Sequence, residues 1–215
     1  MPQPMAHSRS ERHSARLTRV FDRQAPAYAR RRRQTDAGHG REVSWRRRLL
    51  EDAHGAVLEV AVGAGANFAF YPADAVVTAV DVSPAMLAAA KPAAEHAHIA
   101  TTFIHGDIAH LAFPPGHFDA VVTTLGLCSY GNPLCALQQM RTWLKPGGTL
   151  LALEHGLSVF PPLNVLLYAI DPLQYAWAGC HAARRPLALI RQAGFRVRRA
   201  ERHYAGLITM VWADP

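Results

Sequence analysis

The sequence predicts an α/β protein built around a doubly wound, mostly parallel sheet. From Ala56 onward, short apolar stretches that are typical of strands alternate with helical stretches. Several of the expected strands end at turns that carry glycine or an acidic residue, where ligands bind in such sheets. Half of the 215 residues are hydrophobic, which is enough for a packed core and excludes a wholly disordered chain.

Seven strands and several helices follow in order along the chain. Five strands are expected at 57–62, 76–80, 101–105, 118–124 and 149–154, and a last pair at 196–204 and 207–213. Helices are expected at 84–95, 133–144 and 184–193. Ser83 and Pro84 are a suitable cap and first residue for the earliest of these helices. The segment Lys145-Pro146-Gly147-Gly148 predicts the end of the second.

The N-terminal part of the chain is strongly basic. Residues 1–50 contain 13 arginines and four acidic residues, whereas the remainder contains ten basic and twelve acidic residues, for a net charge of +7. We expect a disordered tail at 1–14, basic helices at 15–54 and a core domain at 55–215 with an apolar insertion at 156–183. The arginine clusters at 30–33 and 46–48 fit a solvated helix face, an anionic membrane or nucleic acid. Without a sequence-reading motif, no specific nucleic acid is expected.

Cysteine usage and the N-terminus bear on compartment and metal content. Cys128, Cys135 and Cys180 cannot form a disulfide framework and include no CxxC pair, so no metal site is expected. Cys128 and Cys180 are interpreted as small packing residues. No secretory signal is recognisable, and no apolar run reaches the ~20 residues of a membrane span. We therefore expect a cytoplasmic protein, with peripheral contact to an anionic membrane as an open alternative; the oligomeric state stays open.

The turns after the first three strands carry the candidate cofactor site. The first reads Glu59-Val60-Ala61-Val62-Gly63-Ala64-Gly65-Ala66-Asn67, and its glycines allow close backbone approach to a ligand. A dinucleotide motif would need glycine at Phe68, so hydride transfer with a nicotinamide cofactor is disfavoured. Asp81 can accept both hydroxyls of a ribose, and Asp107 can accept an adenine amine. A helix cap or a solvated turn is the alternative interpretation of each acid.

Five segments together resemble the class I, seven-strand S-adenosylmethionine-dependent methyltransferases. They are the segments at 57–65, 80–87, 106–107, 118–122 and 144–148. The resemblance implies a Rossmann-like three-layer sandwich with a mostly parallel seven-stranded sheet, N-terminal helices and S-adenosylmethionine as the cofactor. It also implies a cofactor site made of Tyr28, Glu59, Ala61, Gly63, Gly65, Asn67, Asp81, Val82, Met86, Gly106, Asp107, Ile108 and Thr124.

Two parts of this resemblance bear on cofactor binding, namely the segment at 21–28 and the residue at position 61. The segment at 21–28 is similar to the N-terminal helix motif that covers the site in this family, which places Tyr28 near the cofactor and gives residues 15–54 the role of a lid. The family's first glycine is replaced by Ala61. Its methyl group is expected to weaken cofactor binding without abolishing it, so Ala61→Gly should bind the cofactor more tightly.

The methyl acceptor is narrowed by what the chain lacks. After the fourth strand there is no Asn/Asp-Pro-Pro-aromatic segment of base-amine methyltransferases, no Pro-Cys motif for cytosine C5, and no paired-glutamate loop of arginine methyltransferases. The segments at 67–72, 127–129, 153–156, 171–172 and 179–181 are similar to alkyl thiol methyltransferases and to bacterial phosphatidylethanolamine N-methyltransferase-like proteins. We expect a small apolar acceptor, with a thiol first, a phospholipid amine second and a quinone precursor as a more distant choice. A non-catalytic module that binds the cofactor or an anionic surface is the alternative from another class.

Three residues are candidates for acceptor chemistry. His155 and His181 could each deprotonate the acceptor, because imidazole titrates near neutral pH. Asp171 could orient a histidine or bind a cationic acceptor. Cys180 is not expected to act as a nucleophile, because direct methyl displacement needs no covalent intermediate. The insertion either buries its own core or forms an apolar acceptor pocket lined by Phe160, Tyr175 and Trp177.

Overall fold

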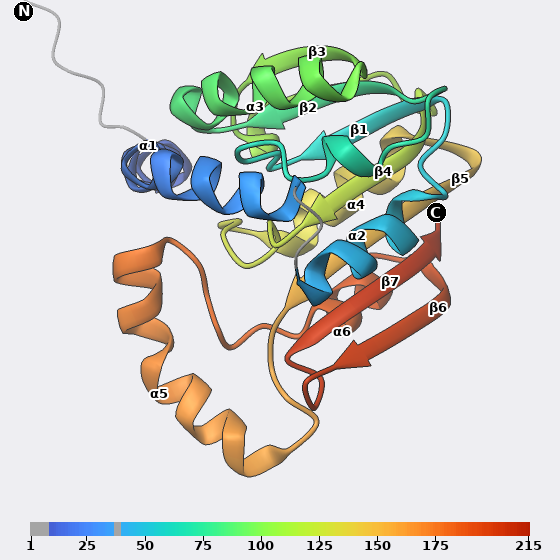
Figure 1. The fold of residues 1–215 in the computed structure, drawn as a ribbon. Helices are drawn as coiled ribbons and strands as arrows, with labels where there is room; N and C mark the ends of the chain where they lie inside the picture. Colours follow the sequence, from blue (N-terminus) through green and yellow to red (C-terminus); the bar gives the residue numbers. More distant parts are fainter. Residues whose placement is uncertain (1–8, 37–39) are drawn as a thin grey trace, which may run out of the picture.

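A seven-stranded sheet forms the centre of the molecule (Figure 1). The computed structural model describes residues 9–36 and 40–215. The strands lie in the order β3-β2-β1-β4-β5-β7-β6, and β7 runs antiparallel to its neighbours. Their bounds are β1 Ala56–Val60, β2 Val76–Asp81, β3 Ala100–His105, β4 Phe118–Thr124, β5 Leu144–His155, β6 Arg196–His203 and β7 Ile208–Asp214. The predicted mostly parallel sheet and its last pair of strands are confirmed.

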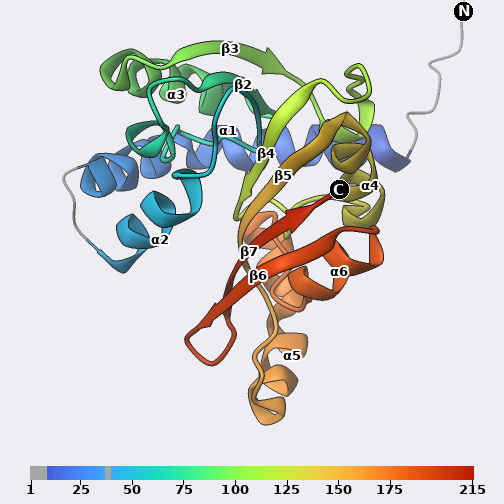
Figure 2. The same cartoon turned by 90° about the vertical axis from the view of Figure 1, so that its right-hand side faces the viewer.

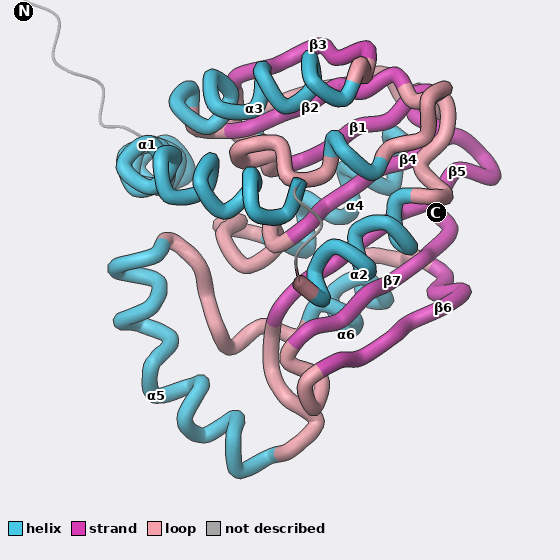
Figure 3. The backbone as a smooth tube through the Cα atoms, in the orientation of Figure 1, coloured by secondary structure: helices cyan, strands magenta, loops and turns pink. Residues whose placement is uncertain are grey.

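Helices cover both faces of the sheet and complete the predicted three-layer sandwich (Figure 3). The helices are α1 Arg9–Asp36, α2 Arg41–Leu50, α3 Pro84–Ala97, α4 Pro133–Trp143, α5 Pro161–Ala178 and α6 Pro186–Gln192, with 3-10 turns η1 Phe68–Phe70 and η2 Ile108–His110. Apolar side chains of α4 and α6 share one core cluster with the sheet, and those of α2 and α3 share another. Two separate cores therefore fix the sheet between the helical layers.

Element boundaries differ from the predictions where tertiary contacts decide them. β5 begins at Leu144 and not at the expected residue 149, because Leu144 already pairs with Phe118 of β4. The last helix begins at Pro186 and not at Arg184, whose guanidinium binds backbone carbonyls of the turn after β4. The expected tail at 1–14 is wrong for residues 9–14, which are helical; residues 1–8 lie outside the described part of the chain.

Tertiary contacts also account for the early start of α1. Ser14 donates a hydrogen bond to Asp107, and His13 Nε2 lies 3.1 Å from the carbonyl oxygen of Ser129. His13 Nδ1 lies 2.9 Å from the hydroxyl of Tyr175. These partners lie far along the chain, so a reading of local composition gives no sign that this segment is ordered.

The insertion forms α5, which extends away from the sheet (Figure 2). Asn164 is its buried residue and is bonded to the backbone of Ser158, while Trp177 is 81% exposed and Phe160, at its N-cap, 59% exposed. The helix therefore does not bury a core of its own. Among residues 9–36 and 40–215, no helix has the length and apolar character needed to cross a membrane.

Candidate active site

One cavity lies at the carboxyl edge of the parallel strands, where α1 crosses the turns that follow β1 to β4. The expected cofactor residues that line it are Tyr28, Ala61, Gly63, Asp81, Val82, Met86, Gly106, Asp107, Ile108 and Thr124. The alternation of strands and helices brings these side chains together because parallel strands present their ends at a common edge. Glu59, Gly65 and Asn67 are not among the residues that line it.

The turn after β1 contains three residues with a left-handed backbone, Ala61, Gly63 and Gly65, and leaves space for a ligand at Gly63. Ala61 has φ 58°, a conformation that favours glycine, and Gly63 has φ 55°. No atom lies within 4 Å of the position that a Cβ on Gly63 would take, so a ligand can approach the backbone there. At Gly65 a Cβ would lie 2.7 Å from the ring of Phe68. Gly65 therefore makes room for the packing of Phe68 rather than for a ligand.

Asp81 stands at the end of β2 in the position expected for a ribose-binding carboxylate. It accepts hydrogen bonds from the backbone N–H groups of Gly63 at 2.8 Å and Ser83 at 2.9 Å. Burial raises its pKa to about 6, although these hydrogen bonds act in the opposite direction. The two backbone donors fix the orientation of the carboxylate, and each oxygen keeps a further lone pair for a ligand.

The face of α1 toward the sheet is attached at four-residue intervals. Thr18 donates to the carbonyl oxygen of Val82 at 3.0 Å, and Asp22 accepts from the hydroxyl of Ser83 at 2.6 Å. One turn earlier, Ser14 donates to Asp107. Residues four apart lie on one side of a helix, so these three contacts hold a single stripe of α1 over the cavity.

Glu59 and Asn67 lie beneath the cavity and support its floor. Asn67 Nδ2 donates to Glu59 Oε1 at 2.7 Å, and the Tyr71 hydroxyl donates to Glu59 Oε2 at 2.8 Å. All three residues are buried. Burial raises the pKa of Glu59 to about 7 despite these two donors. Asn67 also bonds Arg46 and Thr124, which line the cavity, so Glu59 and Asn67 are connected to the cavity through these two residues.

Arg46 is a cavity residue that the sequence pattern did not indicate. It is only 4% exposed, and its guanidinium binds Asn67 Oδ1 at 2.5 Å and Thr124 Oγ1 at 3.1 Å. The carboxylate of Glu42 forms an ion pair with this guanidinium at 2.5 Å. The sequence pattern at residues 46–48 indicates one basic cluster and does not reveal the separate role of Arg46. Arg46 follows Val43 by three residues, and both lie on the buried side of α2.

The acceptor candidates do not lie in this cavity. His181 Nδ1 pairs with Asp171 at 2.7 Å and the ring stacks on Tyr175 at 4.2 Å, while His155 lies beside Cys128 and Cys180. None of His155, His181 and Asp171 lines the cavity. His155 is the last residue of β5, as expected, whereas Asp171 lies within α5 and His181 just beyond it, so these two candidates belong to the insertion.

The three residues of the insertion that were expected to line an acceptor pocket do not line this cavity. Phe160 and Trp177 are largely exposed, whereas Tyr175 is partly buried and its hydroxyl lies 2.9 Å from Nδ1 of His13, which does line the cavity. The apolar wall next to the candidate cofactor residues comes instead from Leu17 and Phe21 of α1 and Leu125 after β4. Positions one turn apart in α1 could have indicated Leu17 and Phe21.

The types of residue that line the cavity suit the chemical groups of S-adenosylmethionine. An oriented carboxylate at Asp81 suits a ribose, the open backbone at Gly63 suits close approach, and Val82, Met86 and Ile108 supply apolar surface for an adenine ring.

Known proteins resemble this chain over much of its length. A family profile described as a methyltransferase domain matches residues 57–148. The thiol S-methyltransferase TMT1B of Homo sapiens is 41% identical over 105 residues, covering 46% of this chain and 42% of that protein. Its Rattus norvegicus counterpart is 37% identical over 147 residues, covering 65% and 59%. This chain therefore spans about half the length of these relatives.

The match to a bacterial relative extends over a larger share of both chains. The demethylmenaquinone methyltransferase of Renibacterium salmoninarum is 34% identical over 169 residues, which is 75% of this chain and 68% of that protein. Among solved structures, an S-adenosylmethionine-dependent methyltransferase from Mesorhizobium loti aligns with TM-score 0.62 and 16% identity over 79% of this chain and 95% of that chain. The YcgJ protein of Bacillus subtilis aligns with TM-score 0.63 and 17% identity over 77% and 73%. With the sheet order and the cavity, these likenesses show that the chain belongs to the class I S-adenosylmethionine-dependent methyltransferases.

Proposed function

We propose that the protein methylates the sulfur of a small apolar thiol. The observation that carries the proposal is one cavity whose lining includes both the carboxylate of Asp81 and the apolar side chains of Leu17, Phe21 and Leu125. The thiol S-methyltransferases that this chain resembles support the choice of sulfur. An uncharged apolar thiol needs burial and alignment more than specific polar partners, which suits this wall.

The proposed cofactor contacts follow from the other residues of this lining. Asp81 accepts the ribose hydroxyls, Asp107 accepts the adenine amine, and Val82 and Ile108 pack on the adenine. Asp107 also accepts a hydrogen bond from Ser14 of α1, so α1 lies against the carboxylate that would bind the adenine amine.

The chemistry asks little of the protein beyond alignment. S-adenosylmethionine supplies an electrophilic methyl group on a sulfonium. As the acceptor sulfur forms its bond to carbon, the bond from carbon to the sulfonium breaks and the thiol proton leaves to solvent. The thiolate is the reactive form of such an acceptor, and in this proposal its proton passes to water rather than to a protein base. His155 and His181, which lie away from the cavity lining, have no part in this proposal.

Product analysis tests the proposal. The protein is incubated with methyl-labelled S-adenosylmethionine and, separately, a small alkyl thiol, a demethylated quinol and phosphatidylethanolamine in anionic liposomes. We expect a methyl thioether and stoichiometric S-adenosylhomocysteine in the first mixture. Label on the quinol alone would replace the thiol by a quinone precursor, which the similarity to a demethylmenaquinone methyltransferase favours. Label on the lipid alone would support headgroup methylation. S-adenosylmethionine binding with no product in any mixture would favour a binding module.

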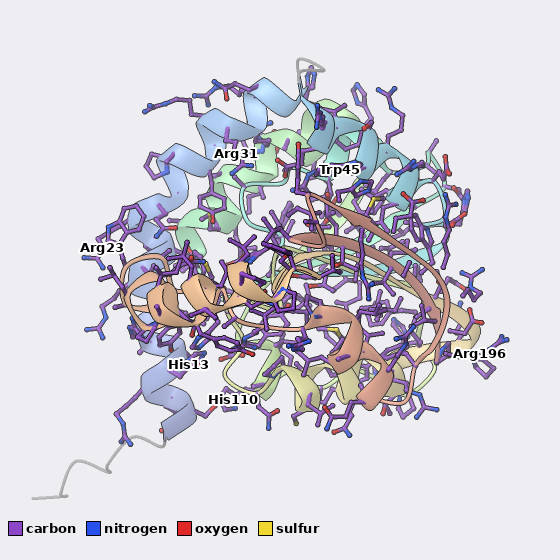
Figure 4. The ribbon with its side chains drawn as sticks, turned by 90° about the horizontal axis from the view of Figure 1, so that it is seen from below. His13, Arg23, Arg31, Trp45, His110 and Arg196 are labelled. Atoms are coloured by element: carbon purple, nitrogen blue, oxygen red, sulfur yellow. The ribbon has the colours of Figure 1, made fainter. Side chains whose placement is uncertain are left out.

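We also propose peripheral contact with an anionic membrane through α5 and α1. The apolar residues Val165, Leu166, Leu173 and Trp177 of α5 are each more than half exposed. Figure 4, seen from the side on which α5 lies, shows Arg23 and Arg31 along α1. Apolar side chains beside a basic helix suit the interface of an anionic bilayer, where apolar acceptors also collect.

Liposome sedimentation tests this surface. Wild-type protein should bind phosphatidylserine-containing vesicles, release them as salt rises, and bind neutral vesicles weakly. Leu173→Glu should weaken vesicle binding about tenfold, because a carboxylate replaces an apolar side chain that would insert into the bilayer. Val76→Glu is the matched control, since Val76 is equally apolar and 58% exposed but lies at the start of β2. Equal loss in both variants, or none in Leu173→Glu, would refute contact through α5.

A further inference from the structure

Two cysteines and a histidine meet beside the cavity, although more than twenty residues separate each from the next along the chain. Cys128 lies in the turn after β4, His155 is the last residue of β5, and Cys180 follows α5. One ligand atom from each lies within 4.8 Å of the other two. Cys128 is buried, and the other two are partly exposed. The absence of a CxxC motif predicted no metal site, but the fold assembles three ligands from separate segments.

The backbone around this cluster is held from several directions. Arg184 donates to the carbonyl oxygens of Leu127 at 2.7 Å and Tyr130 at 2.6 Å. The backbone N–H of His181 donates to the carbonyl oxygen of Cys128 at 2.9 Å. These bonds attach the segment that carries Cys180 to the turn that carries Cys128.

The third segment is attached in the same way. The backbone N–H of Leu157 donates to the carbonyl oxygen of Arg184 at 2.7 Å. A Cβ on Gly156 would clash with that carbonyl, so glycine next to His155 permits this close approach. The three ligands are therefore fixed by the surrounding backbone in the absence of an ion.

We propose that Cys128, His155 and Cys180 bind a thiophilic divalent cation, Zn²⁺ by preference. Two thiolates and an imidazole are the ligand set that favours zinc over magnesium or calcium. Three protein ligands leave a fourth tetrahedral position for water or another small ligand.

The separations need only a small adjustment. Zinc bonds of about 2.3 Å to sulfur and 2.0 Å to nitrogen place tetrahedral ligand atoms about 3.5 to 3.8 Å apart. Atoms that already lie within 4.8 Å of one another reach these separations by moving about 1 Å. Each thiol gives its proton to solvent as it binds, the imidazole binds through an unprotonated nitrogen, and no oxidation state changes.

The position of the cluster gives the ion a structural consequence. Cys128 lies within the turn 125–130, which contributes Leu125 and Ser129 to the cavity, and Cys180 lies just beyond the exposed helix α5. A bound ion would connect α5 to the acceptor side of the cavity. Occupancy should therefore stabilise the fold and protect α5 from proteolysis.

Cobalt titration of the full chain tests the site. Reduced, chelator-treated protein is titrated with Co²⁺, a spectroscopic substitute for Zn²⁺, and bound metal is measured after dialysis. We expect one equivalent, thiolate-to-cobalt charge-transfer bands, displacement by Zn²⁺, and a Tm higher by about 5 °C or more at saturating Zn²⁺. Cys180→Ser and His155→Gln should weaken binding at least tenfold. Cys135→Ser is the matched control, because Cys135 is exposed and outside the cluster.

Other outcomes would overturn the proposal. Binding that survives in the Cys128→Ser and Cys180→Ser double variant would place the metal elsewhere. A Cys128–Cys180 disulfide found by mass spectrometry, with no cobalt bands in reduced protein, would replace the metal site by a redox-sensitive pair. The readout is metal and not turnover, so it is independent of whether the acceptor is a thiol.

Discussion

The two sides of the cavity are built in different ways. The cofactor side consists of turns that follow β1, β2 and β3, where Asp81 is buried and held by two backbone N–H groups. The proposed acceptor side combines Leu17 and Phe21 of α1 with the turn after β4, and the insertion adds α5, whose apolar surface is largely exposed. The first is fixed by the sheet itself, and the second depends on how separate helices pack. Variants on the two sides should therefore separate cofactor affinity from acceptor use.

A left-handed residue stands on each side of this division. Ala61 has φ 58° on the cofactor side, and Leu125 has φ 57° on the acceptor side. Such conformations cost about 1–2 kcal/mol for residues with a side chain. Both residues line the cavity, so the strain lies where ligands are expected.

The largest expected effect is on the cofactor side. Asp81→Asn should lower S-adenosylmethionine affinity about 10- to 100-fold, because it removes charged hydrogen bonds to the ribose. Isothermal titration calorimetry measures the Kd, and thermal unfolding confirms that the variant is folded. Wild-type affinity should also fall below pH 6, where Asp81 takes up a proton. Asp74→Asn, an exposed aspartate away from the cavity, is the control; an unchanged Kd in folded Asp81→Asn would contradict the assignment.

The second prediction concerns the effect of the buried Glu59 on the free energy of unfolding. The pKa of Glu59 rises from 4.5 to about 7 because the carboxyl is buried. Between these values the folded state binds more protons, so this group lowers stability as pH rises through that window. Glu59→Gln should therefore gain about 1–2 kcal/mol relative to wild type between pH 5 and pH 8.

Urea unfolding at several pH values measures that gain. Glu95→Gln is the control, because Glu95 is exposed on α3 and should give parallel curves. A Glu59→Gln curve that stays parallel to wild type would mean that the carboxyl is already ionised at pH 5 in the folded protein.

On the acceptor side, Leu125→Gly should raise the acceptor KM about tenfold by removing part of the apolar wall. The Kd for S-adenosylmethionine should stay within about twofold, since the polar contacts are unchanged. Initial-rate kinetics with varied thiol and saturating cofactor give the KM. A rise in cofactor Kd with no change in KM would place Leu125 on the cofactor side.

The smallest effect is expected from Ala61→Gly. Glycine relieves the left-handed strain and should stabilise the fold by about 1 kcal/mol. It also removes the methyl group from the cavity and should tighten cofactor binding a few-fold, about 0.5–1 kcal/mol. Thermal unfolding and calorimetry measure the two changes. Weaker binding by Ala61→Gly would show that the methyl group makes a favourable contact.

Local pattern was enough for the sheet and for most of the cofactor side. Runs of apolar residues ending at Ala61, Asp81 and Asp107 predict parallel strands whose ends converge, and the structure places all three at the cavity. This works because a parallel strand buried on both faces and the turn after it are specified by adjacent residues.

Packing between distant segments decided the rest. Composition suggested disorder for residues 9–14, but contacts to Asp107, Ser129 and Tyr175 order them. The sequence suggested that Arg46 belongs to a surface cluster, but in the structure its guanidinium binds Asn67. Helix docking and loop closure depend on partners that no local window contains.

The individual strands and helices and the turn residues at the strand ends follow from local sequence, because adjacent residues specify each of them. Three features became evident only in the folded chain: which helix residues complete the cavity, the projection of α5 from the body, and the meeting of Cys128, His155 and Cys180. The physical reason is that these arrangements arise from contacts between segments tens of residues apart, whose free energy is gained only when the whole chain is folded.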